Sequence, residues 1–152
     1  MKVMKYIGAA VALIGLSASA WSAEFGTKDE AIAMVKKAVA YIGQNGAEKA
    51  YAEFDKKDGS FVDRDLYVVV YGLNGVVLAH GANAKLIGRD MIDATDVDGK
   101  PYVKERLELA AKQADFWQDY KFVNPVTKKI EPKQMYCQRL EKTAVCSGVY
   151  KQ

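Results

Sequence analysis

The sequence predicts an α+β domain, in which a long N-terminal helix and a shorter crossover helix pack on a five-stranded antiparallel sheet. Three observations predict this class. Apolar residues recur at helical spacing from about residue 27 to 54 and again after Pro101, two β-branched runs flank Asn74-Gly75, and three further strand-like runs lie within residues 115–150. The expected order is therefore a helix, two strands, a crossover with a helix, and three strands.

The first helix begins with a capping signal. Thr27 and Glu30 have the spacing of a capping box, in which each side chain satisfies a backbone N–H of the other residue. The sequence "GQNG", residues 43–46, predicts a break or kink, after which a helical pattern resumes and ends in the turn residues that follow Phe54.

The middle of the chain predicts a hairpin and a second helix. Asn74-Gly75 is a strong hairpin signal because both residues tolerate positive φ. Pro101 is typical of a helix start. Before it, "DATDVDGKPY", residues 93–102, begins like a calcium loop but lacks the glutamate that would close it. We therefore expect a turn leading into the helix, and no metal site.

The two cysteines, Cys137 and Cys146, fit opposite positions of a C-terminal hairpin. If Glu141-Lys142 forms the tip, these cysteines face each other at a non-hydrogen-bonded pair, with Cα atoms roughly 4.5 Å apart. That spacing is at the short end of the disulfide range of roughly 4.4–6.8 Å. We expect a disulfide; the alternatives are two small buried hydrophobic residues, or a longer tip with a shifted register.

The N-terminus has the features of a secretory signal peptide. Lys2 and Lys5 precede an apolar run that is too short to span a bilayer, and small residues follow. We expect residues 1–22 to be a signal peptide, cleaved between Trp21 and Glu24, and residues 23–152 to form one exported domain, periplasmic or secreted. Removing residues 1–22 takes away two lysines and no acid, so 20 basic residues face 19 acidic ones. This balance argues against a nucleic-acid partner, and export favours the disulfide.

The sequence contains no recognisable catalytic set, so we expect neither an enzyme nor a cofactor. It has one histidine, no nucleophile elbow, no phosphate loop and no metalloprotease motif. It does have many aromatic side chains, which would form a small-ligand pocket if they met on one sheet face, or simply a core. Lys133 is the more informative residue, because a lysine within an apolar strand must reach an anion or solvent.

Three stretches together resemble the single Cache domain, the extracytoplasmic sensor module of bacterial chemoreceptors and sensor kinases. They are "LYVVVYGLNGVVLAHGANAKLIGRDMIDATDVDGKPYV", "WQDYKFVNPVTKKIEPKQMYCQRL" and the closing "SGVY". The resemblance covers roughly Thr27 to Tyr150. It implies a PAS-like sheet with a long N-terminal helix, and a pocket for a small organic ligand, often a short carboxylate.

The resemblance also implies which residues bind that ligand. Lys133 would pair with the carboxylate, His80 and the tyrosines would donate hydrogen bonds, and Trp117 would form an apolar wall. The implied ligand-binding residues are His80, Tyr102, Trp117, Tyr120, Lys133 and Tyr136. Strand alternation places Lys133 and Tyr136 on opposite sides of one strand, so a bulge or twist would be needed to bring both to one ligand.

Two functions follow from these observations. The first is an exported sensory protein that binds a short organic acid and presents it to a membrane receptor or kinase. The second is an interaction module without a free ligand, whose N-terminal helix pairs with itself, as a homodimer, or with another protein. A thermal shift with a small acid, lost in Lys133→Ala, would distinguish the first from the second.

Overall fold

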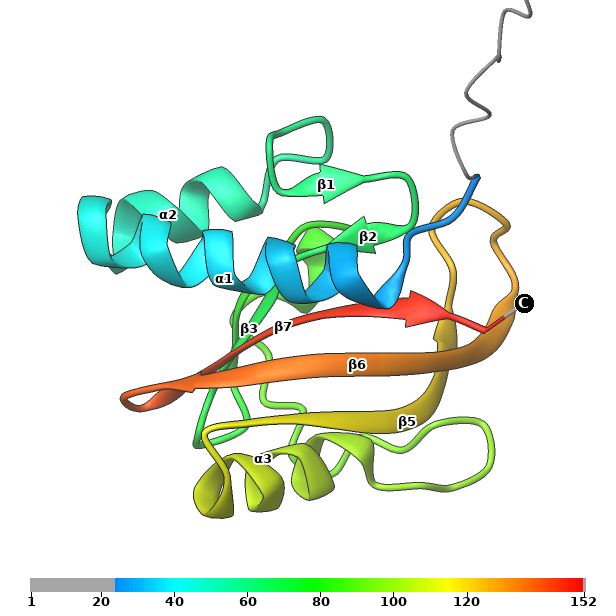
Figure 1. The fold of residues 1–152 in the computed structure, drawn as a ribbon. Helices are drawn as coiled ribbons and strands as arrows, with labels where there is room; N and C mark the ends of the chain where they lie inside the picture. The colour runs from blue at the N-terminus through cyan, green and yellow to red at the C-terminus, as the bar shows by residue number, and fades with distance from the viewer. Residues whose placement is uncertain (1–23, 152) are drawn as a thin grey trace, which may run out of the picture.

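The computed structural model describes residues 24–151, which form an α+β domain with a five-stranded antiparallel sheet in the order β4-β3-β7-β6-β5 (Figure 1). The predicted fold class is thus confirmed. The predicted signal peptide, residues 1–22, lies outside the described residues. In chain order the elements are α1 (Lys28–Asn45), α2 (Ala47–Phe54), β1 (Val62–Asp63), β2 (Leu66–Tyr67), β3 (Val69–Gly72), β4 (Val77–His80), the 3-10 turn η1 (Ala84–Leu86), α3 (Tyr102–Lys112), β5 (Asp115–Val123), β6 (Ile130–Leu140) and β7 (Thr143–Tyr150).

The N-terminal helix begins and breaks where the sequence predicts. The Thr27 hydroxyl accepts from the Glu30 N–H, and the Glu30 carboxylate accepts from the Thr27 N–H, which completes the capping box. Gly46 has φ 80°, a left-handed value that favours glycine, and it separates α1 from α2.

The predicted hairpin at Asn74-Gly75 is present, with an irregular register. Val70 pairs with Ala79 but Tyr71 pairs with Val77, so a bulge interrupts the ladder. Gly75, at φ 93°, lies against residues 90–92, and a Cβ there would be 2.8 Å from the Cβ of Ile92. A short ribbon of β1 and β2 precedes this hairpin; the sequence analysis did not predict it, because two-residue strands carry almost no periodicity.

The C-terminal hairpin has the predicted register. Leu140 pairs with Thr143 across the two-residue tip, and Cys137 pairs with Cys146. The two cysteines form a disulfide with Cα atoms 4.1 Å apart, so the predicted bridge is confirmed.

Helices cover both faces of the sheet, and each face has its own core. Figure 1 shows α1 and α2 on one side and α3 on the other. The core under α1 and α2 includes Val35, Phe54 and Val145, whereas the core under α3 includes Val103 and Met135. We call these sides the α1 face and the α3 face.

The connection from β4 to α3, residues 81–101, completes the cover of the α3 face. Its partly buried residues Leu86, Met91 and Ile92 pack against the core there. Near its end, the Asp96 carboxylate accepts from the backbone N–H groups of Asp98 and Lys100, which forms the predicted turn before the helix. Within residues 24–151, no helix is both long and apolar enough to cross a membrane.

Candidate functional site: two buried cations on one sheet face

Lys133 of β6 is buried under the α3 face with an exposed fraction of 1%. Its Nζ donates to the hydroxyl oxygens of Tyr67 at 2.8 Å and Tyr150 at 3.3 Å. Burial lowers the pKa of Lys133 well below its ordinary value, and the positive charge of Arg106 lowers that pKa further.

Gly148 of β7 provides the space in which the Lys133 side chain lies. A Cβ at residue 148 would be 2.9 Å from the Lys133 Cε and 2.5 Å from the Gln134 backbone oxygen. Since real Cβ atoms essentially never approach so closely, a larger residue at 148 would displace the lysine or the strand. The glycine therefore positions the cation.

Arg106 of α3 is the second buried cation, with an exposed fraction of 0%. Its Nε donates to the Gln118 side-chain oxygen at 3.0 Å, and the Gln118 amide donates to the Tyr102 backbone oxygen at 2.9 Å. The Tyr120 side chain approaches the guanidinium as a weak hydrogen-bonding neighbour. Among residues 24–151, however, the buried Nη1 and Nη2 have no partner that meets full hydrogen-bond geometry. Because a guanidinium keeps its proton, these two nitrogens carry buried charge without an acceptor.

A row of aromatic side chains connects the two cations. The Phe122 ring lies in the middle, with centroids 6.5 Å from His80 and 5.8 Å from Tyr120. The Lys133 Nζ is 5.9 Å from the centroid of Phe122, and the Arg106 guanidinium carbon is 4.8 Å from that of Tyr120. Aromatic faces attract cations but supply no negative charge.

His80 of β4 belongs to the same cluster as a neutral ring. It stacks on Tyr67 with centroids 5.1 Å apart. Its Nδ1 accepts from the backbone N–H groups of Ala82 at 3.2 Å and Asn83 at 3.0 Å. Burial, with the positive charge of Lys133, lowers the pKa of His80 to about 3. The ring therefore adds no positive charge at neutral pH.

Asp65 is the acidic residue whose charge acts on Lys133. Its Oδ1 accepts from the Gly26 N–H at 2.6 Å, its Oδ2 is buried without a partner, and burial raises the pKa of this carboxyl group. No ion pair among residues 24–151 includes Lys133 or Arg106. We call Arg106, Lys133 and the rings around them the two-cation site. Those rings are Tyr67, Tyr71, His80, Tyr102, Tyr120, Phe122 and Tyr150.

The structure divides the six predicted ligand residues between two faces. His80, Tyr102, Tyr120 and Lys133 lie together in the two-cation site. Trp117 and Tyr136 lie on the α1 face, with ring centroids 5.3 Å apart, and line a separate groove of about 540 Å³. The pairing of β5 with β6 is regular from end to end, so no bulge carries Tyr136 to the side of Lys133.

Sequence analysis missed Arg106, because a charged residue in a helix is most often solvated. A signal was nevertheless present. Tyr102, Val103, Leu107 and Ala110 form the buried stripe of α3, and Arg106 falls within that stripe at helical spacing. A lone arginine on the apolar side of a helix, like a lone lysine in an apolar strand, indicates that the buried cation has an anionic or hydrogen-bonding partner.

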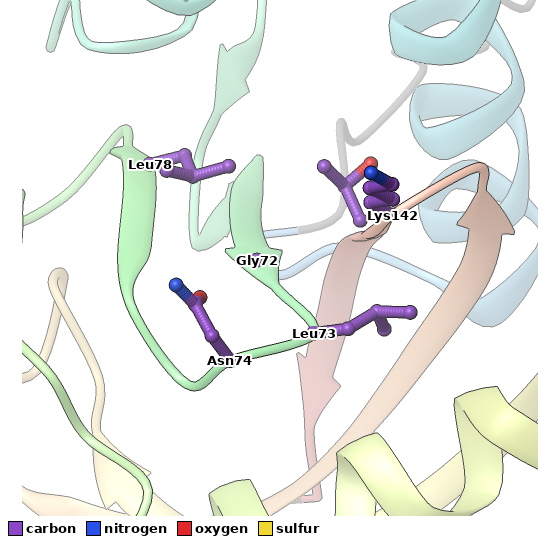
Figure 2. Close-up of a pocket in the computed structure, with 6 residues that line it drawn as sticks. Gly72, Leu73, Asn74, Leu78 and Lys142 are labelled. Atoms are coloured by element: carbon purple, nitrogen blue, oxygen red, sulfur yellow. The ribbon is translucent and has the colours of Figure 1, made fainter.

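Other hollows lie at the surface of the domain. One, of about 370 Å³, lies at the hairpin ends of the sheet and is lined by Gly72, Leu73, Asn74, Leu78, Lys142 and Thr143 (Figure 2). Its lining contains one charged residue, Lys142, which the view shows at the β6–β7 turn. Another, of about 280 Å³, is lined by Tyr67 of the two-cation site together with Lys57, Arg64 and Lys128.

The family model "Single Cache domain 2" matches residues 2–150, so the chain belongs to the single Cache domain family. Members of this family are extracytoplasmic ligand-binding sensor modules. The predicted family is thus confirmed.

Solved structures show the same fold. One, described as "structural basis for carboxylic acid recognition by a Cache chemosensory domain", has a TM-score of 0.71 at 20% identity and covers 82% of this chain and 92% of that chain. A methyl-accepting chemotaxis protein from Vibrio parahaemolyticus has a TM-score of 0.69 at 22% identity, covering 81% and 87%. A "periplasmic sensor domain of chemotaxis protein" has a TM-score of 0.63 at 21% identity, covering 82% and 90%. Among curated proteins, no significant match was found.

Proposed function

We propose that the protein is an exported sensory protein that binds a short organic acid in the two-cation site. The observation that carries the proposal is the pair of buried basic side chains: within residues 24–151, Arg106 has two guanidinium nitrogens without an acceptor, and Lys133 has only tyrosine hydroxyls as partners. A carboxylate supplies two acceptor oxygens to a guanidinium and one negative charge. Within the predicted set, His80, Tyr102, Tyr120 and Lys133 keep this role, and Arg106 joins them.

The buried position of the cations supports ligand binding over a purely structural role. Removing a charge from water costs several kcal/mol unless good partners replace the water. Natural proteins retain such unfavourable arrangements mainly at functional sites. The proposal is also in keeping with the solved structure of the same fold that is described as recognising carboxylic acids.

A thermal-shift screen of the purified protein against short carboxylates tests this function. A ligand at one hundred times its Kd stabilises the native state by about 2.7 kcal/mol and raises the melting temperature accordingly. We expect at least one acid to give such a shift, and Arg106→Gln to lose it. Arg89→Gln, which changes an exposed arginine, is the matched control. If no acid raises the melting temperature, the ligand-binding function is wrong. Measurement of the molecular mass in solution should then test the homodimer through α1.

We further propose that a membrane receptor or kinase reads the bound state outside the cytoplasm. The family consists of extracytoplasmic sensor modules, and the N-terminal sequence has the order of a signal peptide. Fractionation of the producing cells, followed by N-terminal sequencing, tests this part. We expect the protein in the periplasm or the medium, starting between Trp21 and Glu24; an intact cytoplasmic chain would contradict it.

A further inference from the structure

The two cations of the site occupy separate places on separate elements. The Arg106 guanidinium is surrounded by the rings of Tyr71, Tyr102 and Tyr120, at 5.0, 5.4 and 4.8 Å from their centroids. The Lys133 Nζ lies over the ring of Tyr67, 4.1 Å from its centroid, and over that of Tyr150, at 4.6 Å. The two cations share no ring at these short distances, so each has its own pocket of aromatic groups.

One acidic group would satisfy only part of this arrangement. A carboxylate at the unpartnered nitrogens of Arg106 would neutralise the guanidinium but leave Lys133 with its two tyrosine hydroxyls. A second anionic group beside Lys133 would favour its protonated form, since an opposite charge at short range stabilises a buried cation. Phe122 and the neighbouring rings form an apolar wall between the two positions.

On these grounds, and resting on the proposed function, we propose that the ligand is a dianion. It is a small organic molecule with an acidic group at each end, one bound by Arg106 and the other by Lys133. Its middle is apolar and contacts Phe122. Lys133 takes up a proton from solution when this ligand binds, so the complex contains two positive and two negative charges.

The proton taken up on binding can be assigned to Lys133 only if the neighbouring titratable groups do not change their protonation. Tyr67 and Tyr150 contact its Nζ from β2 and β7, and burial raises the pKa values of both tyrosines, so they stay neutral. His80 on β4 stays neutral as well, because its pKa is lowered to about 3. Among the other charged and titratable neighbours, Arg106 on α3 keeps its charge, Tyr120 on β5 stays neutral, and Asp65 next to β2 has a raised pKa.

Asp65 is the other group that could change protonation on binding. An approaching anion would favour the protonated carboxyl of Asp65, just as it favours the protonated amine of Lys133. An Asp65→Asn variant separates the two sources, because it removes the carboxyl and leaves Lys133 in place. We expect it to retain the proton uptake.

The experiment compares acids that differ only in the second charge. Isothermal titration calorimetry of the purified protein at pH 7.5 is run with butyrate against succinate and with valerate against glutarate, each pair having equal carbon number. We expect the better diacid to bind at least about tenfold more tightly than its matched monoacid. Titrations in phosphate and in Tris, which differ in ionisation enthalpy, should give an uptake of close to one proton per diacid bound.

Substitution of the lysine completes the test. Lys133→Met should bring the diacid to the affinity of the monoacid and remove the proton uptake, while Lys104→Met, which changes an exposed lysine on α3, should change neither. Circular dichroism confirms that each variant is folded. A monoacid that binds as tightly as its diacid, or a diacid affinity that survives Lys133→Met, would overturn the dianion proposal while leaving an acid-binding function intact. If neither kind of acid binds, the proposed function itself fails.

Discussion

At Lys133, the structure predicts a conflict between stability and ligand binding. Burial lowers the pKa of Lys133 in the folded protein, whereas in the unfolded chain the amine keeps its ordinary pKa. At neutral pH the amine must therefore lose its proton when the chain folds, which lowers the free energy of unfolding. A methionine of similar length would avoid this cost. After Lys133→Met, the Tyr67 and Tyr150 hydroxyls still face each other at 3.3 Å, and Tyr150 still donates to the Val123 oxygen. The variant should therefore leave no new unpaired group.

We expect Lys133→Met to raise the free energy of unfolding of the empty protein by about 1–3 kcal/mol at pH 7. Urea denaturation measures this change. Because the folded-state pKa of Lys133 is lowered, the stability of the wild type should increase as pH rises towards 10, and Lys133→Met should lack that increase. A variant less stable than the wild type at pH 7 would contradict the interpretation of Lys133 as a buried amine that destabilises the fold.

His80 predicts a second dependence on pH, at acidic values. Its folded pKa is about 3 and its ordinary value is 6.5, so between these values the unfolded chain binds a proton that the folded protein does not. Stability should be lost as pH falls through this window, at up to about 1.4 kcal/mol per pH unit from this residue. In His80→Asn, whose amide oxygen can accept in place of Nδ1, the loss between pH 6 and 4 should be smaller. Parallel curves of melting temperature against pH for the two proteins would show that His80 contributes nothing.

The hairpin of β6 and β7 connects the site to the rest of the sheet, and at Gly148 the two strands leave no room for a side chain. We expect Gly148→Ala to destabilise the protein by about 1–3 kcal/mol and to weaken acid binding, because the added Cβ meets the Gln134 oxygen at 2.5 Å and Lys133 at 2.9 Å. Chemical denaturation and calorimetry measure the two effects.

The matched control for this substitution is Gly43→Ala in α1, where an added Cβ has no atom within 4 Å. That change should stabilise the helix by about 0.5–1 kcal/mol and leave binding unchanged. Equal effects of the two substitutions would mean that the close approach at residue 148 has no role.

The disulfide stabilises the same hairpin near its tip. Replacing Cys137 and Cys146 together by alanine should lower the free energy of unfolding by about 2–3 kcal/mol, because the bridge closes a short loop in the unfolded chain. Urea denaturation with and without a reducing agent measures it: the reductant should lower the stability of the wild type and leave the double variant unchanged. A wild type that is insensitive to reductant at its unfolding midpoint would contradict a stabilising bridge.

Elements with strong local signals could be predicted from the sequence. The capping box at Thr27, the break at Gly46 and the hairpin register that pairs Cys137 with Cys146 all follow from patterns within a few residues of each other. The β1–β2 ribbon could not be predicted in this way, because its formation depends on tertiary contacts such as the Arg64 bond to the Phe25 oxygen.

At the scale of the whole molecule, the site was harder to predict than the fold. Alternation along β6 already separates Lys133 from Tyr136, and the regular β5–β6 register extends that separation to Trp117. Arg106 could not be assigned to the site from the sequence, because its meeting with β5 and β6 depends on how α3 crosses the α3 face. Residues that reach one site from distant elements are placed by tertiary packing, which a single sequence does not reveal.

The complete burial of both cations has a consequence for the motion of the whole domain. Since Arg106 and Lys133 have exposed fractions of 0% and 1%, a ligand can reach them only while part of the cover is open. The α1 face packs as a separate core on the other side of the sheet. The cover of the α3 face, residues 81–101, is mostly irregular connection, and such segments open at lower free energy than core strands.

We therefore expect hydrogen exchange at residues 81–101 to be fast in the empty protein and to slow markedly when the acid identified by thermal shift is added. Exchange in α1 should change little. Amides that exchange only through global unfolding are an exception, because a bound ligand stabilises the whole protein and slows all of them equally. Mass spectrometry of peptides from both regions makes the measurement. If protection increases in α1 and not in residues 81–101, the ligand binds on the α1 face, near the groove lined by Trp117 and Tyr136, and the two-cation site is not where recognition occurs.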